Sequence, residues 1–138
     1  MSAQKGKDLL LKIDNDGLGT FVTVAGLRSK RIAFNSETVD VTDSDSAGRW
    51  RELLAGSGIQ RAAISGSGLF KDAASDATIR TRFFAGAISD WQFVVPDFGT
   101  LEGPFQTTSL EYTGNHDGEV TFEMALESAG PVSFTVTP

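Results

Sequence analysis

The chain has 138 residues, the length of one domain, and its 40% apolar and 22% charged residues are typical of a globular protein rather than a disordered one. The net charge of −6 argues against a surface that wraps nucleic acid or binds an anionic membrane, and the absence of cysteine excludes disulfides, thiol catalysis and cysteine metal sites. From the length we expect one domain over residues 1–138. No apolar run is long enough for a membrane span or a signal peptide, so we expect synthesis in the cytoplasm.

The first half of the chain predicts short strands separated by polar turns. Apolar residues alternate with polar ones, or β-branched residues cluster, in segments bounded by Gly, Asn and Asp. The predicted strands cover residues 9–14, 21–25, 32–34, 39–41 and 59–67. Residues 43–48 are small or polar and predict an exposed loop, and residues 49–54 predict one helical turn. The last of these strands is rich in small side chains, which leave room for a neighbouring backbone.

One helix is predicted, from Asp72 to Gly86. Its apolar stripe includes Ile79 and Phe83, which are four residues apart and therefore lie on one face. Either Asp72 or Ser75 can cap the first turn. Gly86 ends the helix, because glycine accepts the left-handed conformation that commonly follows a last helical turn.

The second half of the chain returns to strands. These are predicted at residues 91–95, 105–112, 120–126 and 132–136, with a hairpin turn at residues 114–118. Phe105 has a different parity from Leu110 and Tyr112, which a β-bulge near Thr107 or Thr108 explains. The predicted fold is mainly β: an antiparallel β-sandwich or barrel of about eight or nine strands with one flanking α-helix.

Charge is distributed unevenly along the chain. Every Lys and Arg lies at or before Arg82, whereas residues 83–138 hold eight acidic side chains and no basic one. Chance combined with pairing inside one fold is one interpretation. The other is a molecule with one face that repels polyanions and another that is neutral to basic, which suits head-to-tail association between copies.

No arrangement of residues in the sequence indicates catalysis. The single histidine, His116, lies in a polar turn without a nucleophile nearby, and Ser67 lacks the G-x-S-x-G frame. The turn that begins at Asp14 resembles the start of a calcium loop, but Ala25 occupies the position where a bidentate Glu is required. We therefore expect no enzyme activity, no cofactor and no resident metal.

Two groups of residues have both an interpretation as a binding site and an ordinary structural interpretation. The spacing of Asp40, Asp43 and Asp45 suits weak binding of a divalent cation, but a solvated acidic loop is the simpler interpretation. Trp50 lies between two arginines beside the predicted loop; it either packs within its own chain or anchors a contact with a neighbour, since Trp and Arg are enriched in interfaces.

Six segments spread over nearly the whole chain follow one another in a characteristic order: Met1–Leu11, Val39–Thr42, Arg49–Gly56, Ile64–Asp72, Pro96–Gly99 and Leu126–Ser128. Together they resemble the major tail tube protein family of long-tailed phages and phage-derived gene-transfer agents. The compact length is similar to that of the gene-transfer-agent branch.

The resemblance implies six copies per ring, rings stacked into a tube through which DNA leaves the particle, and an inner wall made of strands from all six copies. It also implies that the N-terminal arm and a loop reach the adjacent ring, and that the tube contacts tape-measure, terminator and distal tail proteins, with no membrane partner. The expected inter-ring residues are Lys5, Lys7, Asp40, Asp43, Asp45, Arg49, Trp50 and Arg51. For the lumen we expect the acidic strand face of Glu119, Glu123 and Glu127, for which a plain solvated outer face is the alternative.

The alternative function is a soluble β-sandwich binding module of the carbohydrate-binding or adhesin type. It requires an exposed aromatic platform, for which Trp91 and Phe93 are the candidates. Their alternation with Gln92 and Val94 is also that of an ordinary core strand. The two functions therefore differ in whether these rings are exposed and in whether the chain associates with itself.

Overall fold

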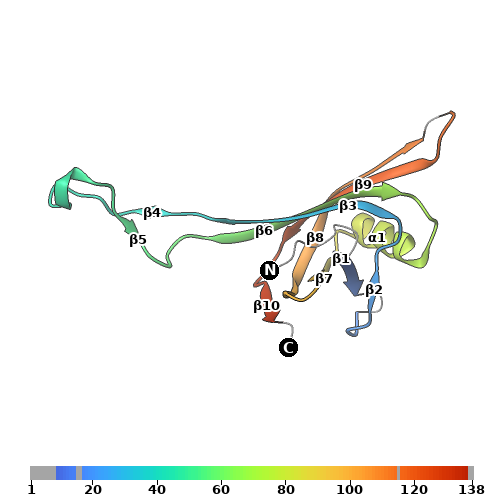
Figure 1. Cartoon of the computed structure of the whole chain (residues 1–138), viewed down its shortest axis with the longest axis horizontal. Helices are drawn as coiled ribbons and strands as arrows, with labels where there is room; N and C mark the ends of the chain where they lie inside the picture. The colour runs from blue at the N-terminus through green and yellow to red at the C-terminus, as the bar shows by residue number, and fades with distance from the viewer. Residues whose placement is uncertain (1–8, 15–16, 115, 137–138) are drawn as a thin grey trace.

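The computed structural model describes residues 9–14, 17–114 and 116–136, which form ten strands and one α-helix. Figure 1 shows a body with a long thin projection at one end. The strands are β1 (Leu10–Asp14), β2 (Phe21–Thr23), β3 (Leu27–Ser36), β4 (Val39–Asp40), β5 (Leu53–Leu54), β6 (Gln60–Leu69), β7 (Ile88–Val95), β8 (Gly99–Gly114), β9 (Val120–Ser128) and β10 (Ser133–Val136), and the helix is α1 (Ala74–Ala85).

Eight strands form one antiparallel sheet in the order β2-β1-β7-β8-β9-β6-β3, with β10 paired to β8. This confirms the predicted mainly β fold with one helix. The strand predicted at residues 32–34 is much longer in the structure, since β3 has ten residues. The sequence does not show the apolar–polar alternation expected of this strand, because a basic residue occupies a core-side position. Lys30 points to the core side, where its ammonium donates a hydrogen bond to the carbonyl of Leu9.

The bulge predicted near Thr107 or Thr108 is confirmed by a register shift between Thr107 and Ser109 in the β8–β9 pairing. The first part of β8 pairs with β7 and β10, whereas its pairing with β9 begins at Phe105, just before the bulge, and continues to the end of the strand. This long strand therefore joins the two parts of the sheet that enclose the core. The largest fully buried side chains are Trp91, Phe105, Leu11, Ile13, Ile64, Ile79 and Leu126.

Helix α1 covers the core at the end of the body away from the projection (Figure 1). Neither predicted cap acts as one: the Asp76 carboxylate accepts a hydrogen bond from the Ala73 amide at 3.0 Å, and the Ser75 hydroxyl accepts one from the Ala25 amide at 3.1 Å. Gly86 ends the helix with φ of +64°, as predicted. No helix within the described ranges has the length and apolar character needed to cross a membrane.

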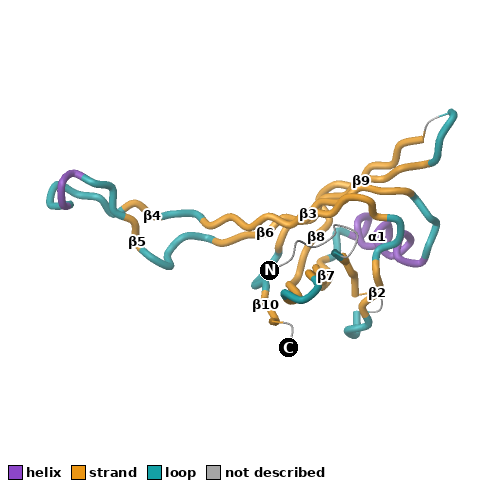
Figure 2. The backbone as a smooth tube through the Cα atoms, in the orientation of Figure 1, coloured by secondary structure: helices purple, strands orange, loops and turns teal. Residues whose placement is uncertain are grey.

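The projection, which we call the arm, consists of residues 37–59 between the last paired residues of β3 and β6. Strands β4 and β5 pair with each other within it, and Figure 2 shows the outgoing and returning segments of the arm running side by side to a short helical turn at the tip. The expected helical turn at residues 49–54 is wrong. The turn is a 3₁₀ helix over Ala47–Arg49, and Leu53–Leu54 forms β5, because Val41 and Glu52 pair across the arm instead.

Candidate functional site: an exposed sheet face and a projecting arm

Strands β3, β6, β9 and β8 share a face that no other layer of the described chain covers, and we call it the outer face. In β9, Phe122, Met124 and Leu126 are buried, so the alternate residues point to the opposite side. Cross-strand partners share a face of a sheet, which assigns the neighbouring positions from the pairing register. The outer face comprises Ser29, Arg31, Ala33 and Asn35 of β3, Arg61, Ala63, Ser65 and Ser67 of β6, Thr121, Glu123, Ala125 and Glu127 of β9, and Ser109, Glu111 and Thr113 of β8.

The outer face is polar, and its centre is lined by small side chains. Serine and alanine predominate there, and a shallow hollow of about 300 Å³ includes Ser29, Ser65, Ser67 and Ser109. A sheet with one apolar and one polar face is the usual antiparallel arrangement when that face meets water. The composition of the outer face is therefore that of a surface in contact with water.

Two of the three lumen candidates lie within the outer face. Glu123 is directly opposite Ser67 on one side and Glu111 on the other, and Glu127 is opposite Ala63. Glu119 lies just before β9, where its carboxylate is 3.6 Å from the Arg28 guanidinium. Sequence reasoning did not include Glu111 among the lumen candidates. Its position between Leu110 and Tyr112 in an alternating strand was the signal that it lies on the polar face.

The charges of this face are mixed but unevenly placed. Arg31 and Arg61 lie on β3 and β6, and the Arg61 guanidinium is 3.6 Å from the Glu37 carboxylate. The acidic residues Glu111, Glu123 and Glu127 lie on β8 and β9. Like charges directly opposite each other destabilise a sheet, so the Glu111–Glu123 pair has a local cost.

The four-stranded unit β3-β6-β9-β8 has two long strand edges without a partner in the described chain. β3 pairs only with β6, and β8 beyond the bulge pairs only with β9. Exposed edges present rows of unpaired amides and carbonyls, which are templates for pairing with another chain. The two edges lie on opposite sides of the four-stranded unit β3-β6-β9-β8, so one edge of a copy is available to the other edge of the next.

Hydrogen bonds along the arm shape its tip. The Asp40 carboxylate accepts from the Thr42 amide at 2.8 Å, and the Thr42 hydroxyl accepts from the Glu52 amide at 2.7 Å. The hydrogen bonds from Thr42 lower the pKa of Asp40 below its ordinary value. Near the tip, the Asp43 carboxylate accepts from the Asp45 amide at 2.9 Å. The acidic residues are thus used in turn formation, and no cluster of metal ligands is found among the described residues.

The structure brings six of the eight expected inter-ring residues together at the far end of the arm, while Lys5 and Lys7 lie outside the described residues. Trp50 is 76% exposed and stands over Gly48, where a Cβ would lie 2.9 Å from the indole. Arg49 adopts φ of +60°, a conformation that costs a non-glycine residue about 1–3 kcal/mol and is often found at functional sites. Further apolar side chains are exposed along the arm, namely Val39, Val41, Leu53, Leu54 and Ile59.

The aromatic platform required by a carbohydrate-binding module is not formed by the expected residues. Trp91 and Phe93 are buried in the core at 1% and 2% exposure, which confirms the core interpretation. His116 is fully exposed beside Asp117 in the β8–β9 turn. The features that need a partner are therefore the arm and the strand edges, both suited to another protein chain.

The model of one family, described as phage tail tube protein, matches residues 3–134. The chain belongs to this family. No curated protein matches the chain. The tail of an empty gene-transfer-agent particle, refined with helical and six-fold symmetry, is similar at 54% identity with a TM-score of 0.93, covering 97% of this chain and all of that one. The virion of a native gene-transfer-agent particle is similar at 53% identity with a TM-score of 0.90 and the same coverage.

The SPP1 tail tube protein shares the fold, with a TM-score of 0.72 at 15% identity over 96% of this chain and 80% of that one. Taken with family membership along almost the whole length, these matches make the protein a structural component of a tail tube. The resemblance read from the sequence is thereby confirmed.

Proposed function

We propose that six copies of this protein form a ring and that the rings stack into the tube through which DNA leaves a phage or gene-transfer-agent particle. The observation that carries the proposal is the four-stranded unit β3-β6-β9-β8, which has one polar uncovered face and two unpaired edges. A six-fold gene-transfer-agent tail at 54% identity supports the number of copies.

Closure of the ring follows from pairing the β3 edge of one copy with the β8 edge of the next. This contact is heterologous, and it closes when the rotation between copies divides a full turn. Four strands from each of six copies give 24 strands. With strands about 4.8 Å apart and tilted by about 35–45°, the barrel is roughly 45–50 Å across between backbones. Since 16–18 strands already leave an aqueous channel, this barrel has an open bore.

In the closed ring, the outer face of the isolated chain turns toward the axis and forms the wall of the bore. Acidic residues Glu111, Glu123 and Glu127 would repel the phosphates of passing DNA, whereas a basic wall would hold them through counterion release. The small side chains at the centre of the face keep the wall smooth. Because Arg61 lies 3.6 Å from Glu37, its charge is partly compensated locally. DNA would thus pass without being bound specifically.

Stacking of the rings is assigned to the arm and to the N-terminal segment that contains Lys5 and Lys7. Trp50 and the exposed apolar residues of the arm would be covered by the adjacent ring. The tube would end in contacts with the tape-measure, terminator and distal tail proteins. The protein would be synthesised in the bacterial cytoplasm and located in the particle tail.

Imaging of the assembly tests the proposal directly. Electron microscopy of the concentrated protein and of particles from producing cells should show a six-fold tube that contains this chain. A solitary chain at high concentration that is also absent from intact particles would refute it.

The lumen assignment has its own test. In Glu111→Lys, Glu123→Lys and Glu127→Lys variants, particles should assemble normally but deliver DNA more slowly. Asp90→Lys makes the same charge change on β7, away from the outer face, and should leave delivery unchanged. Equal delivery by lumen and control variants would show that the outer face does not line the bore.

A further inference from the structure

We propose that the outward side of helix α1 in one copy seats in a groove at the root of the arm of a copy in the next ring. This inference rests on the proposed stacking of rings and names the two surfaces that meet. Each copy carries both surfaces, so the contact repeats along the tube without a second kind of partner.

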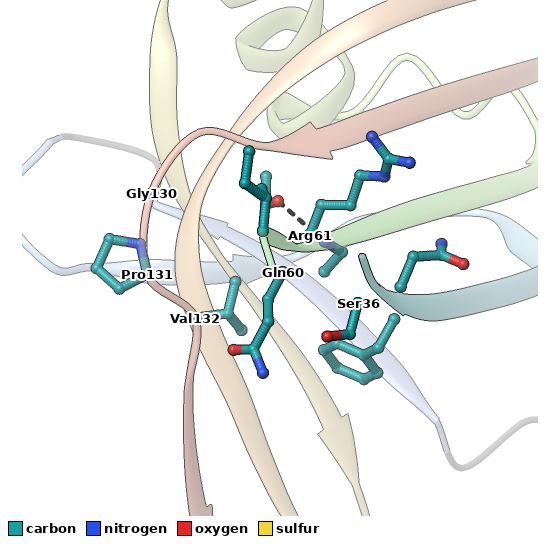
Figure 3. A pocket seen from close by; sticks show the side chains of 11 residues that line it. Ser36, Gln60, Arg61, Gly130, Pro131 and Val132 are labelled. Carbon is teal, nitrogen blue, oxygen red and sulfur yellow. Dashed lines mark hydrogen bonds between the residues drawn. The ribbon is translucent and has the colours of Figure 1, made fainter. Parts of the chain in front are cut away.

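The groove lies in the corner between the arm and the body and has a volume of about 600 Å³. Figure 3 shows Ser36, Gln60 and Arg61 on one side of it and Gly130, Pro131 and Val132 on the other. Two large apolar side chains also line it although they are mostly exposed, Phe34 at 56% and Ile59 at 67%. A concave surface of this size with an apolar lining suits a bulky apolar side chain.

The direction of stacking selects the surface that faces the groove. The arm leaves one end of the body, and α1 lies toward the other end, where the β8–β9 hairpin also projects (Figure 1). From Ser36 to Ala47 the arm spans at most about 36 Å, at about 3.3 Å per residue. A compact body of about 100 residues is roughly 30 Å across, so a copy displaced along the arm fits beneath it and presents its α1 end to the corner.

The exposed side of α1 is unusually apolar for a helix that faces solvent in the isolated chain. Only Arg80 is charged among its exposed positions, and Phe84 is 79% exposed. Ile88, directly after the helix, adds a second apolar side chain at 57% exposure. These two residues are the apolar side chains that would fill the groove.

Charge is complementary between the two ends. The arm between Val39 and Leu54 carries four acidic and two basic side chains, whereas the segment from Lys71 to Arg82 carries three basic and two acidic ones. One of those two acids, Asp76, is buried at the start of the helix. Opposite net charges favour the head-to-tail approach of two copies over the contact of two arms or two helices. At the groove itself the one charged lining residue, Arg61, is offset by the Glu37 carboxylate 3.6 Å away.

The absence of cysteine allows a specific cross-linking test. A chain with both Phe84→Cys and Ile59→Cys should, after oxidation of assembled tubes, give a ladder of covalent multimers that a reductant removes. A disulfide requires Cα atoms about 4.4–6.8 Å apart. Phe84 lies in α1 and Ile59 directly precedes β6 at the arm root, and these elements lie at different ends of the body (Figure 1), so the two positions cannot be bridged within a chain. Each single variant and the pair Phe98→Cys with Ile59→Cys, which uses another exposed phenylalanine, should give no ladder.

A second measurement does not depend on bond formation. Maleimide labelling of Phe84→Cys, incorporated into tubes with excess wild-type protein, should be at least tenfold slower than labelling of the free subunit. Tubes without a ladder and with undiminished labelling would overturn this inference and leave the tube itself intact. Wild-type protein that forms no tube, alone or in particles, would overturn the proposed function instead.

Discussion

Replacing Trp50 with alanine should weaken tube assembly strongly while leaving the subunit stable. The side chain is 76% exposed at the end of the arm, so the monomer gains little from it. A Trp side chain has about 200 Å² of surface, of which about 150 Å² is therefore available for burial by a neighbouring ring. At about 25 cal/mol per Å², this area corresponds to at most about 4 kcal/mol per copy.

Central aromatic residues in interfaces contribute about 2–4 kcal/mol when truncated, which agrees with that upper bound. The concentration at which tubes begin to form should accordingly rise roughly 30- to 700-fold for Trp50→Ala, because each 1.4 kcal/mol corresponds to a factor of ten. Trp50→Phe keeps most of the apolar area and should change it far less. The free energy of unfolding of the subunit should stay within about 0.5 kcal/mol of wild type.

Sedimentation of tubes over a dilution series measures the critical concentration, and denaturant unfolding below it measures subunit stability. A critical concentration that rises less than about threefold, or about 0.7 kcal/mol, would refute the assignment of Trp50 to the ring–ring contact. A large loss of subunit stability would show instead that the indole supports its own chain.

Three further predictions concern the arm and the sheet. Deletion of Asp43–Gly48 should leave a folded monomer by circular dichroism but abolish tubes, and normal tubes in electron micrographs would contradict the role of the tip. Gly68→Ala should lower the free energy of unfolding by about 1–3 kcal/mol in denaturant titration, because its Cβ would lie 2.1 Å from the Gly26 carbonyl oxygen; Gly66→Ala, whose Cβ meets only a leucine methyl at 3.0 Å as its nearest contact, should cost less. NMR titration should find the pKa of Asp40 below its ordinary value of about 3.9, so the stabilisation of the arm turn by the charged carboxyl is present above about pH 3.9 and is lost as the pH falls through the depressed pKa. Thr42→Val removes the hydroxyl but keeps the backbone amide that donates to the carboxylate at 2.8 Å, so the pKa should rise only part of the way to its ordinary value, and equal values in both chains would contradict the role of the hydroxyl.

The alternation of apolar and polar residues was sufficient to predict most strands, because each strand packs one face on the core. Gly86 marked the helix end and the parity change marked the bulge in β8, since both are local backbone requirements. The length of β3 was missed because Lys30 lies on the core side with its ammonium bonded to the Leu9 carbonyl, and sequence polarity alone gives the opposite face.

What the sequence by itself determined is the fold class, the absence of thiol chemistry and the acidity of the second half, since these depend on composition and on neighbours along the chain. Only the tertiary structure decided that Glu111 stands opposite Glu123, that both edges of the four-stranded unit stay open, and that the groove at the arm root and helix α1 lie at different ends of the body. Those features join residues that are far apart in the sequence, and their positions depend on strand register and direction, which local patterns do not specify.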